Sequence, residues 1–392
     1  RDSYEILPVK SNSGNWLVNG GKTNTADIPS LVSTLLTWER VRSFNVGFDF
    51  GAFSNRLTGS FDYFVRKTVD MVGPAPQLPL VLGIAPAIVN NADMKSYGFE
   101  IELSWRDRIG EVDYGVKFNL ADAQQKVVKY PNTTNAFNDW YAGKMSGEIW
   151  GYTSLGIAKT DEEMKEHLAS LPNGGQNQLG NKWGAGDIMY ADINGDGKVD
   201  GGKGTLADPG DQRIIGNSTP RYNFGLVLDA SYKGFDVSIF FQGVGKRDYA
   251  PIVGTNGAVF WGAVNNIWQS MAMEEHFDYF RPEGHPMGAN LNGYYPRPDF
   301  TSNKNHQVQT RYLQDASYIR LKNLQIGYTL PKQWINKLHI NRCRVYVSGD
   351  NLWTGTSLAS MFDPETLAAG DWGSGKTYPL SKVISFGLNV NF

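Results

Sequence analysis

One segment of the chain has the residue types and spacing of a calcium-binding loop. Side-chain oxygens stand at its positions 1, 3, 5 and 9, a glycine at position 6 permits a sharp turn, and position 7 offers a backbone carbonyl. These ligands are Asp192, Asn194, Asp196 and Asp200, with the carbonyl of Lys198. Position 12, where such loops carry a bidentate glutamate, is Lys203. The segment predicts a structural Ca²⁺ site; the alternative is a Gly/Asp-rich turn without metal.

A second set of residues could bind an organic ligand. Aromatic side chains mixed with Asn, Asp, Arg and Gln recur in several long polar segments of the chain. Flat rings stack on sugars and also anchor peptides by burial, so both ligand classes would suit them. Alternatively, such rings form small loop cores or contacts with a partner protein. The candidates for substrate binding are Trp140, Tyr141, Trp261, Trp268, Tyr294 and Tyr295.

Signals for catalysis are weak in this sequence. The five histidines lack a metal-binding spacing such as HExxH, and the chain has no Gly-x-Ser-x-Gly elbow and no phosphate loop. Glu100 and Glu102 lie two residues apart, which puts them on one face of a strand. Charged residues are ordinary on the inner face of a barrel, so this pair of carboxylates does not by itself indicate catalysis. Together with the missing motifs, this leads us to expect that the protein is not an enzyme.

The elements that must position these residues are strands, because apolar and polar residues alternate in nine segments. Most of the segments have about 8 to 11 residues, which exceeds the about 5–6 residues of an ordinary strand and approaches or reaches the length that crosses a bilayer at a tilt. Aromatic residues stand near the ends of several apolar faces, as in the girdles of outer-membrane barrels. The segments are 43–50, 57–66, 98–105, 112–120, 222–232, 235–241, 323–330, 344–348 and 383–392.

The links between these segments alternate strictly between short and long. The long links are 68–97, 126–221, 244–317 and 352–382, and the short link 331–341 contains a helical turn. Outer-membrane barrels have short periplasmic turns and long extracellular loops, whereas a soluble β-sandwich has no need of this asymmetry. The pattern therefore favours an all-β fold, an antiparallel transmembrane β-barrel. Residues 160–171 predict a short surface helix within the second long link.

Composition and strand count narrow the class further. Among 392 residues the net charge is −2, so the chain lacks the basic excess of a nucleic-acid binder. The one cysteine, Cys343, cannot form an internal disulfide, and no apolar run reaches the about 18 residues of a spanning helix. Bacterial single-chain barrels have an even number of strands, so nine strands cannot be a whole barrel. We expect 1–40 to be the remnant of an extracellular loop and 41–392 to be the C-terminal part of the barrel.

Seven segments also carry a family resemblance. In order and spacing they resemble the C-terminal half of the barrel of SusC/RagA-like TonB-dependent transporters of Bacteroidetes outer membranes. The segments are 36–40, 46–49, 55–63, 187–197, 214–217, 318–323 and 348–352.

The resemblance implies a plugged barrel of 22 strands, of which 22 − 9 = 13, with the plug domain, would lie outside this chain. It implies import of oligosaccharides or peptides across the outer membrane, together with a SusD-like surface lipoprotein and driven by the TonB complex of the inner membrane. The wall would contact outer-membrane lipid.

The resemblance also assigns two single residues. Asp211 stands where the family has an acidic residue before an Ile-Gly pair, so we nominate it as the replacement for the missing last calcium ligand. The final strand, which ends at Phe392, resembles the signal that the barrel-assembly machinery reads, and Phe392 would lie at the periplasmic rim.

Two other interpretations of the residues stay open. One is a secreted or surface β-sandwich that binds glycans and is stabilised by calcium, with the aromatic residues as a sugar platform. The other is a calcium-stabilised glycosidase, which needs two carboxylates at a defined separation.

Overall fold

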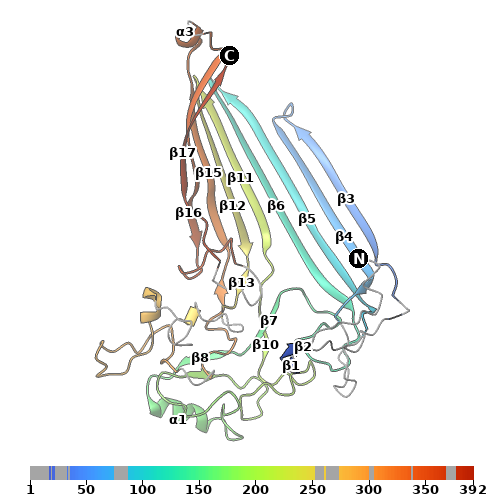
Figure 1. The fold of residues 1–392 in the computed structure, drawn as a ribbon, viewed down its shortest axis with the longest axis vertical. Helices are drawn as coiled ribbons and strands as arrows, with labels where there is room; N and C mark the ends of the chain where they lie inside the picture. Colours follow the sequence, from blue (N-terminus) through green and yellow to red (C-terminus); the bar gives the residue numbers. More distant parts are fainter. Residues whose placement is uncertain are drawn as a thin grey trace.

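A single nine-stranded antiparallel sheet dominates the computed structural model (Figure 1). The structure describes residues 17–18, 20–22, 33, 36–74, 87–251, 260–261, 273–299, 304–336, 339–367 and 377–392. Neighbours in the sheet follow chain order, so the prediction of nine successive antiparallel strands is confirmed. The strands are β3 (Arg40–Ala52), β4 (Leu57–Val72), β5 (Asn90–Ile109), β6 (Val112–Lys129), β11 (Arg221–Tyr232), β12 (Phe235–Lys246), β15 (Tyr318–Thr329), β16 (Arg342–Thr356) and β17 (Val383–Asn391).

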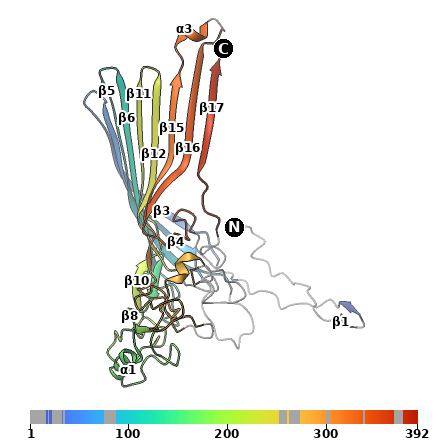
Figure 2. The same ribbon diagram turned by 90° about the vertical axis from the view of Figure 1, so that its left-hand side faces the viewer.

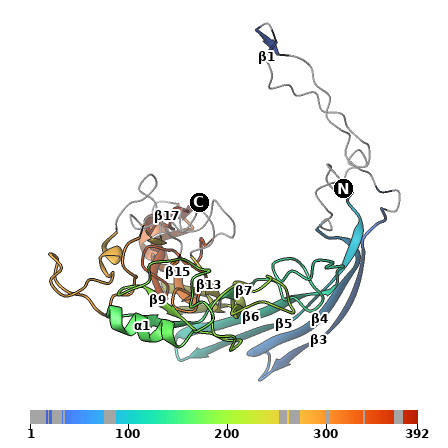
Figure 3. The ribbon, with the colours of Figure 1, turned by 90° about the horizontal axis from the view of Figure 1, so that it is seen from below.

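The sheet is curved but not closed. Figure 3 shows its strands as an arc, and β3 and β17 form its two unpaired edges. The described part of the chain is therefore a partial barrel.

The register separates an apolar face from a polar face. Phe48 is paired with Phe61, and the same row continues through Ile101 to Leu120. One residue away, Asp49 begins a polar row that continues through Ser60, Glu102 and Asn119. The apolar face is open: Phe48 is 60% exposed and Phe386, on β17, is 85% exposed. An apolar face without a second layer packed on it is typical of a barrel whose outer surface contacts lipid.

Several strands are longer than their alternation predicts. β4, β5 and β6 have 16, 20 and 18 residues, so the predicted loop 68–97 is shortened at both ends by Val72 and Asn90. The predicted loops 126–221, 244–317 and 352–382 also begin too early, because β6, β12 and β16 end at Lys129, Lys246 and Thr356. Backbone hydrogen bonds continue a ladder even where side chains on both faces become polar, which an alternation rule does not detect.

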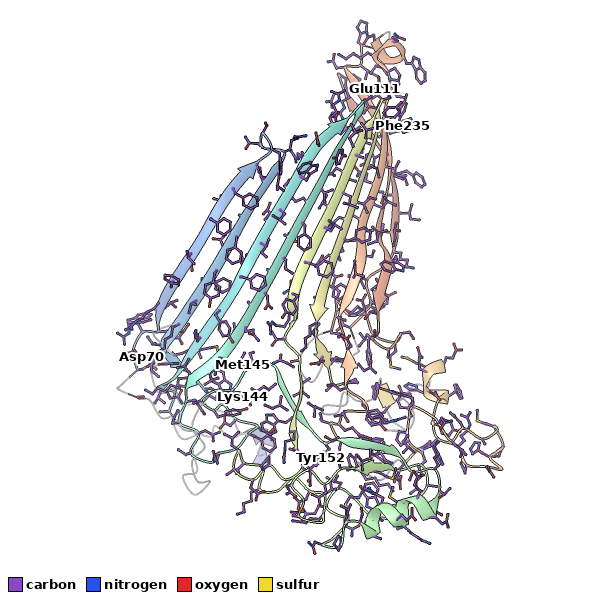
Figure 4. The ribbon with its side chains drawn as sticks, turned by 180° about the vertical axis from the view of Figure 1, so that it is seen from behind. Asp70, Glu111, Lys144, Met145, Tyr152 and Phe235 are labelled. Carbon is purple, nitrogen blue, oxygen red and sulfur yellow. The ribbon has the colours of Figure 1, made fainter. Side chains whose placement is uncertain are left out.

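The short links form tight connections at one end of the sheet. β11 and β12 are joined by Lys233 and Gly234, whose φ angles of 46° and 90° are those of a hairpin turn with two left-handed residues. The predicted helical turn in 331–341 is α3 (Lys332–Ile335), at the same end as the chain's last residue (Figure 2). Figure 4 shows Glu111 and Phe235 at this end and Asp70 at the opposite end.

The long links build a separate body of loops at the far end of the sheet (Figure 1). α1 (Asp161–Ala169) confirms the predicted helix, and the Thr160 hydroxyl caps it by accepting a hydrogen bond of 3.1 Å from the Glu163 amide. None of the described helices has the length and hydropathy of a membrane-spanning helix. The small elements are β1 (Leu17–Val18), β2 (Gly21–Lys22), β7 (Glu148–Gly151), β8 (Ser154–Ile157), β9 (Ile188–Tyr190), β10 (Arg213–Asn217), β13 (Asp248–Tyr249), β14 (Gln314–Asp315) and the 3₁₀ helix η5 (Glu274–Phe277).

Candidate functional site

The loop body has its own aromatic core. Its centre is Trp261, whose ring lies 4.7 Å from that of Tyr312, and both side chains are almost fully buried. Tyr152, between β7 and β8, and Tyr190, on β9, also belong to this core (Figure 4 labels Tyr152). Their ring centroids are 5.7 Å apart. Because residues from several loops share this core, the loops pack together as one folded body and do not project separately from the sheet.

This core contains part of the predicted substrate-binding set. Trp261 and Tyr295 are 1% and 3% exposed, so their rings pack inside the loop body and do not reach a ligand at its surface. Their burial fits the alternative that loop aromatics form small cores. Tyr294 is half-buried, and Trp268 lies outside the described residues.

Trp140 and Tyr141 are half-buried and stand on an ordered turn after β6. The Lys144 ammonium donates hydrogen bonds of 2.9 Å and 2.8 Å to the carbonyls of Phe137 and Asp139, and lies 5.4 Å from the Tyr141 ring (Figure 4). Burial lowers the pKa of Lys144 from its usual value. Trp140 packs on the polar-face side of β5 and β6 with Met94. These two aromatic residues therefore stay candidates for ligand contact.

Asp187 holds two distant parts of the loop body together. Its carboxylate is fully buried and accepts hydrogen bonds from Arg297 at 2.9 and 2.6 Å, from the Lys304 ammonium at 2.9 Å and from the Asn305 amide at 2.9 Å. The Gly184 amide donates a fifth bond of 2.9 Å. Since Lys304 is itself 1% exposed, this is a buried ion pair whose groups are satisfied by several hydrogen bonds.

The six predicted calcium ligands lie in one loop, between β9 and β10. The Asp192 carboxylate accepts backbone hydrogen bonds from Gly195 at 2.6 Å and Gly197 at 2.8 Å. Asp211 accepts hydrogen bonds from the amides of Ile193 and Asp200 at 2.7 and 2.8 Å, so it ties the loop together; its role as the replacement calcium ligand stays a prediction. The remaining predicted ligands are Asn194, Asp196, Lys198 and Asp200.

Charges within this loop are partly compensated by the chain itself. The ammonium group of Lys198 forms a close ion pair with the Asp200 carboxylate. In the described part of the chain, no three acidic, histidine or cysteine side chains lie close enough together to hold a metal ion. The Lys198 ammonium would compete with a bound cation for the Asp200 carboxylate, and Ca²⁺ in this loop stays a prediction.

Metal analysis of the purified protein tests this prediction. A calcium loop is expected to retain about one Ca²⁺ per chain, and Asp196→Ala is expected to lose it, because position 5 supplies a side-chain oxygen. Asp208→Ala, in the same loop but outside the ligand pattern, is the matched control and should keep the metal. Full calcium occupancy in Asp196→Ala, or no calcium in the unmodified protein, would contradict the predicted site. The alternative of a Gly/Asp-rich turn without metal would then hold.

An ionic cluster joins the sheet to the last long loop. Arg320, on β15 and 4% exposed, contacts Asp363 at 2.7 Å and Glu365 at 2.8 Å, and it also donates to the Thr354 hydroxyl at 2.8 Å. Lys322 contacts Glu365 at 2.6 Å. The segment 358–367 is thereby fixed against β15 and β16, over the end of the sheet nearest the loop body.

The polar face of the sheet is acidic between β3 and β6. Asp62 and Glu100 are direct cross-strand partners, and with Glu102 they line a hollow of about 530 Å³ on this face. Only Glu102 among these three has an ion-pair partner in the described residues, Lys117 at 2.6 Å. The expectation that Glu100 and Glu102 share one strand face is confirmed by the register.

Phe392 follows β17 and is 85% exposed, like Phe386 on the apolar face. Its role as an assembly signal stays a prediction.

Comparisons with known proteins agree with this architecture. Residues 8–352 match the family model "TonB dependent receptor-like, beta-barrel". The chain is 28% identical to TonB-dependent receptor P3 of Formosa agariphila over 99% of this chain and 38% of that protein. It is 20% identical to TonB-dependent receptor SusC of Bacteroides thetaiotaomicron over 100% of this chain and 36% of that protein. The chain thus spans less than two-fifths of the length of these relatives.

A solved structure shares the fold. The structure of the RagAB peptide transporter superposes on this chain with a TM-score of 0.71 and 23% identity, over 99% of this chain and 39% of that one.

Proposed function

Because the chain belongs to the family of TonB-dependent receptor-like β-barrels, we propose that it forms wall and extracellular loops of an importer in the bacterial outer membrane. The single observation that carries the proposal is the nine-stranded sheet with an exposed apolar face outside and a polar face inside. Such a wall is stable in lipid and leaves a polar passage for hydrophilic solutes. A β-sandwich needs a second sheet packed on the first, whereas the other described sheets have two strands each.

We infer that the imported solute is an oligosaccharide or a peptide and that it is captured by the loop body. The half-buried ring of Trp140 and the acidic hollow around Glu100 support this inference, because they place a flat apolar surface and hydrogen-bonding groups on the inner side. A SusD-like lipoprotein would close over the loops, and the TonB complex would supply energy. The relatives named SusC and RagAB support these partners by analogy. Import requires no chemical change of the solute, so no catalytic group is assigned.

Extraction and co-purification of the full-length protein from its own cells test the proposal. The protein is expected in the outer-membrane fraction, released only by detergent, together with a surface lipoprotein and a residual oligosaccharide or peptide. A control extraction with salt or alkaline buffer should leave it in the membrane, because apolar strands and not charges hold it there. Release into the aqueous phase without detergent would contradict the proposal; an intact membrane protein without lipoprotein or solute would contradict the inferred partners alone.

A further inference from the structure

Four cationic side chains stand side by side across four neighbouring strands. The register pairs Arg42 on β3 with Lys67 on β4, Lys67 with Lys95 on β5, and Lys95 with Lys126 on β6. Directly opposite residues have Cβ atoms about 4.5–5.5 Å apart, so the row spans about 15 Å. No sequence pattern indicates this row, because its members lie 25, 28 and 31 residues apart along the chain.

The row lies on the lipid-facing side of the sheet. Lys67 follows Phe61, Tyr63 and Val65 at every second position of β4, so it shares their face. On β5, Lys95 stands two residues before Tyr97 and four before Phe99, so it shares their face. The opposite face at this level is covered by the loop core of Ala92, Val127 and Tyr130 with Trp140, which leaves the cations on the outer surface.

The height of the row coincides with the edge of the membrane. Counted from the short-turn end, Lys67 is 67 − 57 = 10 residues from Leu57, and Lys95 is 105 − 95 = 10 residues from Trp105, which is the cross-strand partner of Leu57. A tilted transmembrane strand needs about 9–11 residues to cross the hydrocarbon. The cations therefore stand where the apolar band ends, at the level of the lipid headgroups on the loop side.

The surrounding carboxylates compensate this charge only in part. Lys67 contacts Asp93 at 3.7 Å, and Lys95 lies 5.2 Å from the Tyr97 ring. Among the residues that the structure describes, Arg42, Lys95 and Lys126 form no ion pair. The next row adds Arg40, which is paired with Asp70 (Figure 4 labels Asp70), and Lys129. Like charges directly opposite each other destabilise a sheet, so an anionic partner outside the protein would offset a real cost.

We propose that this row binds the phosphate group of a glycolipid in the outer leaflet of the membrane. The inference rests on the proposed function, since only a wall that spans the membrane presents the row to lipid headgroups. A lipid is the occupant that the geometry favours, because on β3, β4 and β5 the row directly continues the apolar lipid-facing surface. Acyl chains would cover Phe61 and Val65 while the phosphate meets the lysines. Phosphate suits ammonium and guanidinium groups as a charge-assisted hydrogen-bond acceptor.

Native mass spectrometry of the full-length protein in detergent, with added phosphorylated lipid A, tests the proposal. The variant Lys67→Gln/Lys95→Gln/Lys126→Gln is expected to bind this lipid about 100-fold more weakly, since each cation near an anionic lipid surface contributes about a factor of five. The matched control is Lys159→Gln/Lys165→Gln/Lys203→Gln, which removes three exposed loop lysines and should bind as the unmodified protein does.

Three results would overturn the proposal. They are unchanged lipid binding in the triple variant, equal binding of dephosphorylated lipid A, and displacement of the lipid by millimolar inorganic phosphate, which would identify a site for free phosphate. If the triple variant is absent from the outer-membrane fraction, the single variant Lys95→Gln is measured in its place. Its lipid binding is expected to be about fivefold weaker than that of the unmodified protein. If the unmodified protein is itself not a membrane protein, the proposed function fails; if it is inserted but binds no phosphorylated lipid, this inference alone fails.

Discussion

Replacing Asp187 with alanine is expected to open the loop body, at a cost of about 3–5 kcal/mol in its free energy of unfolding. The substitution removes the acceptor of hydrogen bonds from Arg297, Lys304 and Asn305. Lys304 is 1% exposed, so its ammonium group would lose its nearest carboxylate while it stays buried, and would keep only Asp299 at 3.8 Å. Loss of one member of a buried ion pair is far more destabilising than loss of an exposed pair.

Amide hydrogen exchange can measure this destabilisation at single residues of the loop body. The Ile188 amide donates a 3.0 Å hydrogen bond to the side chain of Asn305 and is buried, so its exchange reports opening of the segment that Asp187 organises. In Asp187→Ala we expect this amide to exchange at least about 100-fold faster, while amides in the middle of β11 and β12 stay unchanged.

A double substitution separates charge from packing. In Asp187→Ala/Lys304→Met the buried ammonium that lost its nearest carboxylate is gone, so much of the lost protection is expected to return. Unchanged exchange in Asp187→Ala would show that the ion pair does not hold the loop body together. Equal damage in the single and the double variant would attribute the effect to lost hydrogen bonds of Arg297 and Asn305 instead.

Arg320→Met is expected to release the segment 358–367 from the sheet, at a cost of about 3 kcal/mol. The methionine fills a similar volume but leaves Asp363, which is 7% exposed, without its guanidinium partner. Glu365 keeps Lys322, so Lys322→Met is a control with a smaller effect, below about 1 kcal/mol, because this pair is partly solvated. Hydrogen exchange of 358–367 measures both changes, and equal exchange in the two variants would contradict the proposed role of Arg320.

The same cluster predicts how the attachment depends on pH. Burial alone would raise the pKa of Asp363, but hydrogen bonds from Arg320 and from the amides of Glu365 and Leu380 outweigh burial and lower it. A carboxyl whose pKa is lower in the folded state stabilises that state above its ordinary pKa of about 3.9, and this stabilisation is lost as the pH falls through the folded value. Protection of 358–367 should therefore be constant near neutral pH and decline in acid, and the decline should be weaker in Arg320→Met.

Local features were readable from the residues alone. Alternation along 383–392 or 57–66 predicts strands because successive side chains of an extended backbone point to opposite faces, whatever the strand pairs with. Thr160 and the acidic residues after it predict the start of α1 because a cap is completed within one turn. The alternation also predicted the central part of each strand, but not that β4 to β6 continue beyond it, since ladder hydrogen bonds depend on a neighbouring strand.

The contacts between loop residues could not be predicted without the tertiary structure. Trp261 and Tyr295 resemble ligand-binding residues in the sequence, yet partners from several loops bury them. The pairing of Asp187 with Lys304 joins residues 117 positions apart, a separation over which no periodic pattern extends.

The sequence by itself determined the strand class, the alternation of short and long links, and which face of each strand is apolar. Only the tertiary structure decided which residues of different strands meet, as in the row from Arg42 to Lys126, and which loop residues are buried. The physical reason is that periodicity belongs to the local backbone, whereas register and loop packing are set by contacts between segments far apart in the chain.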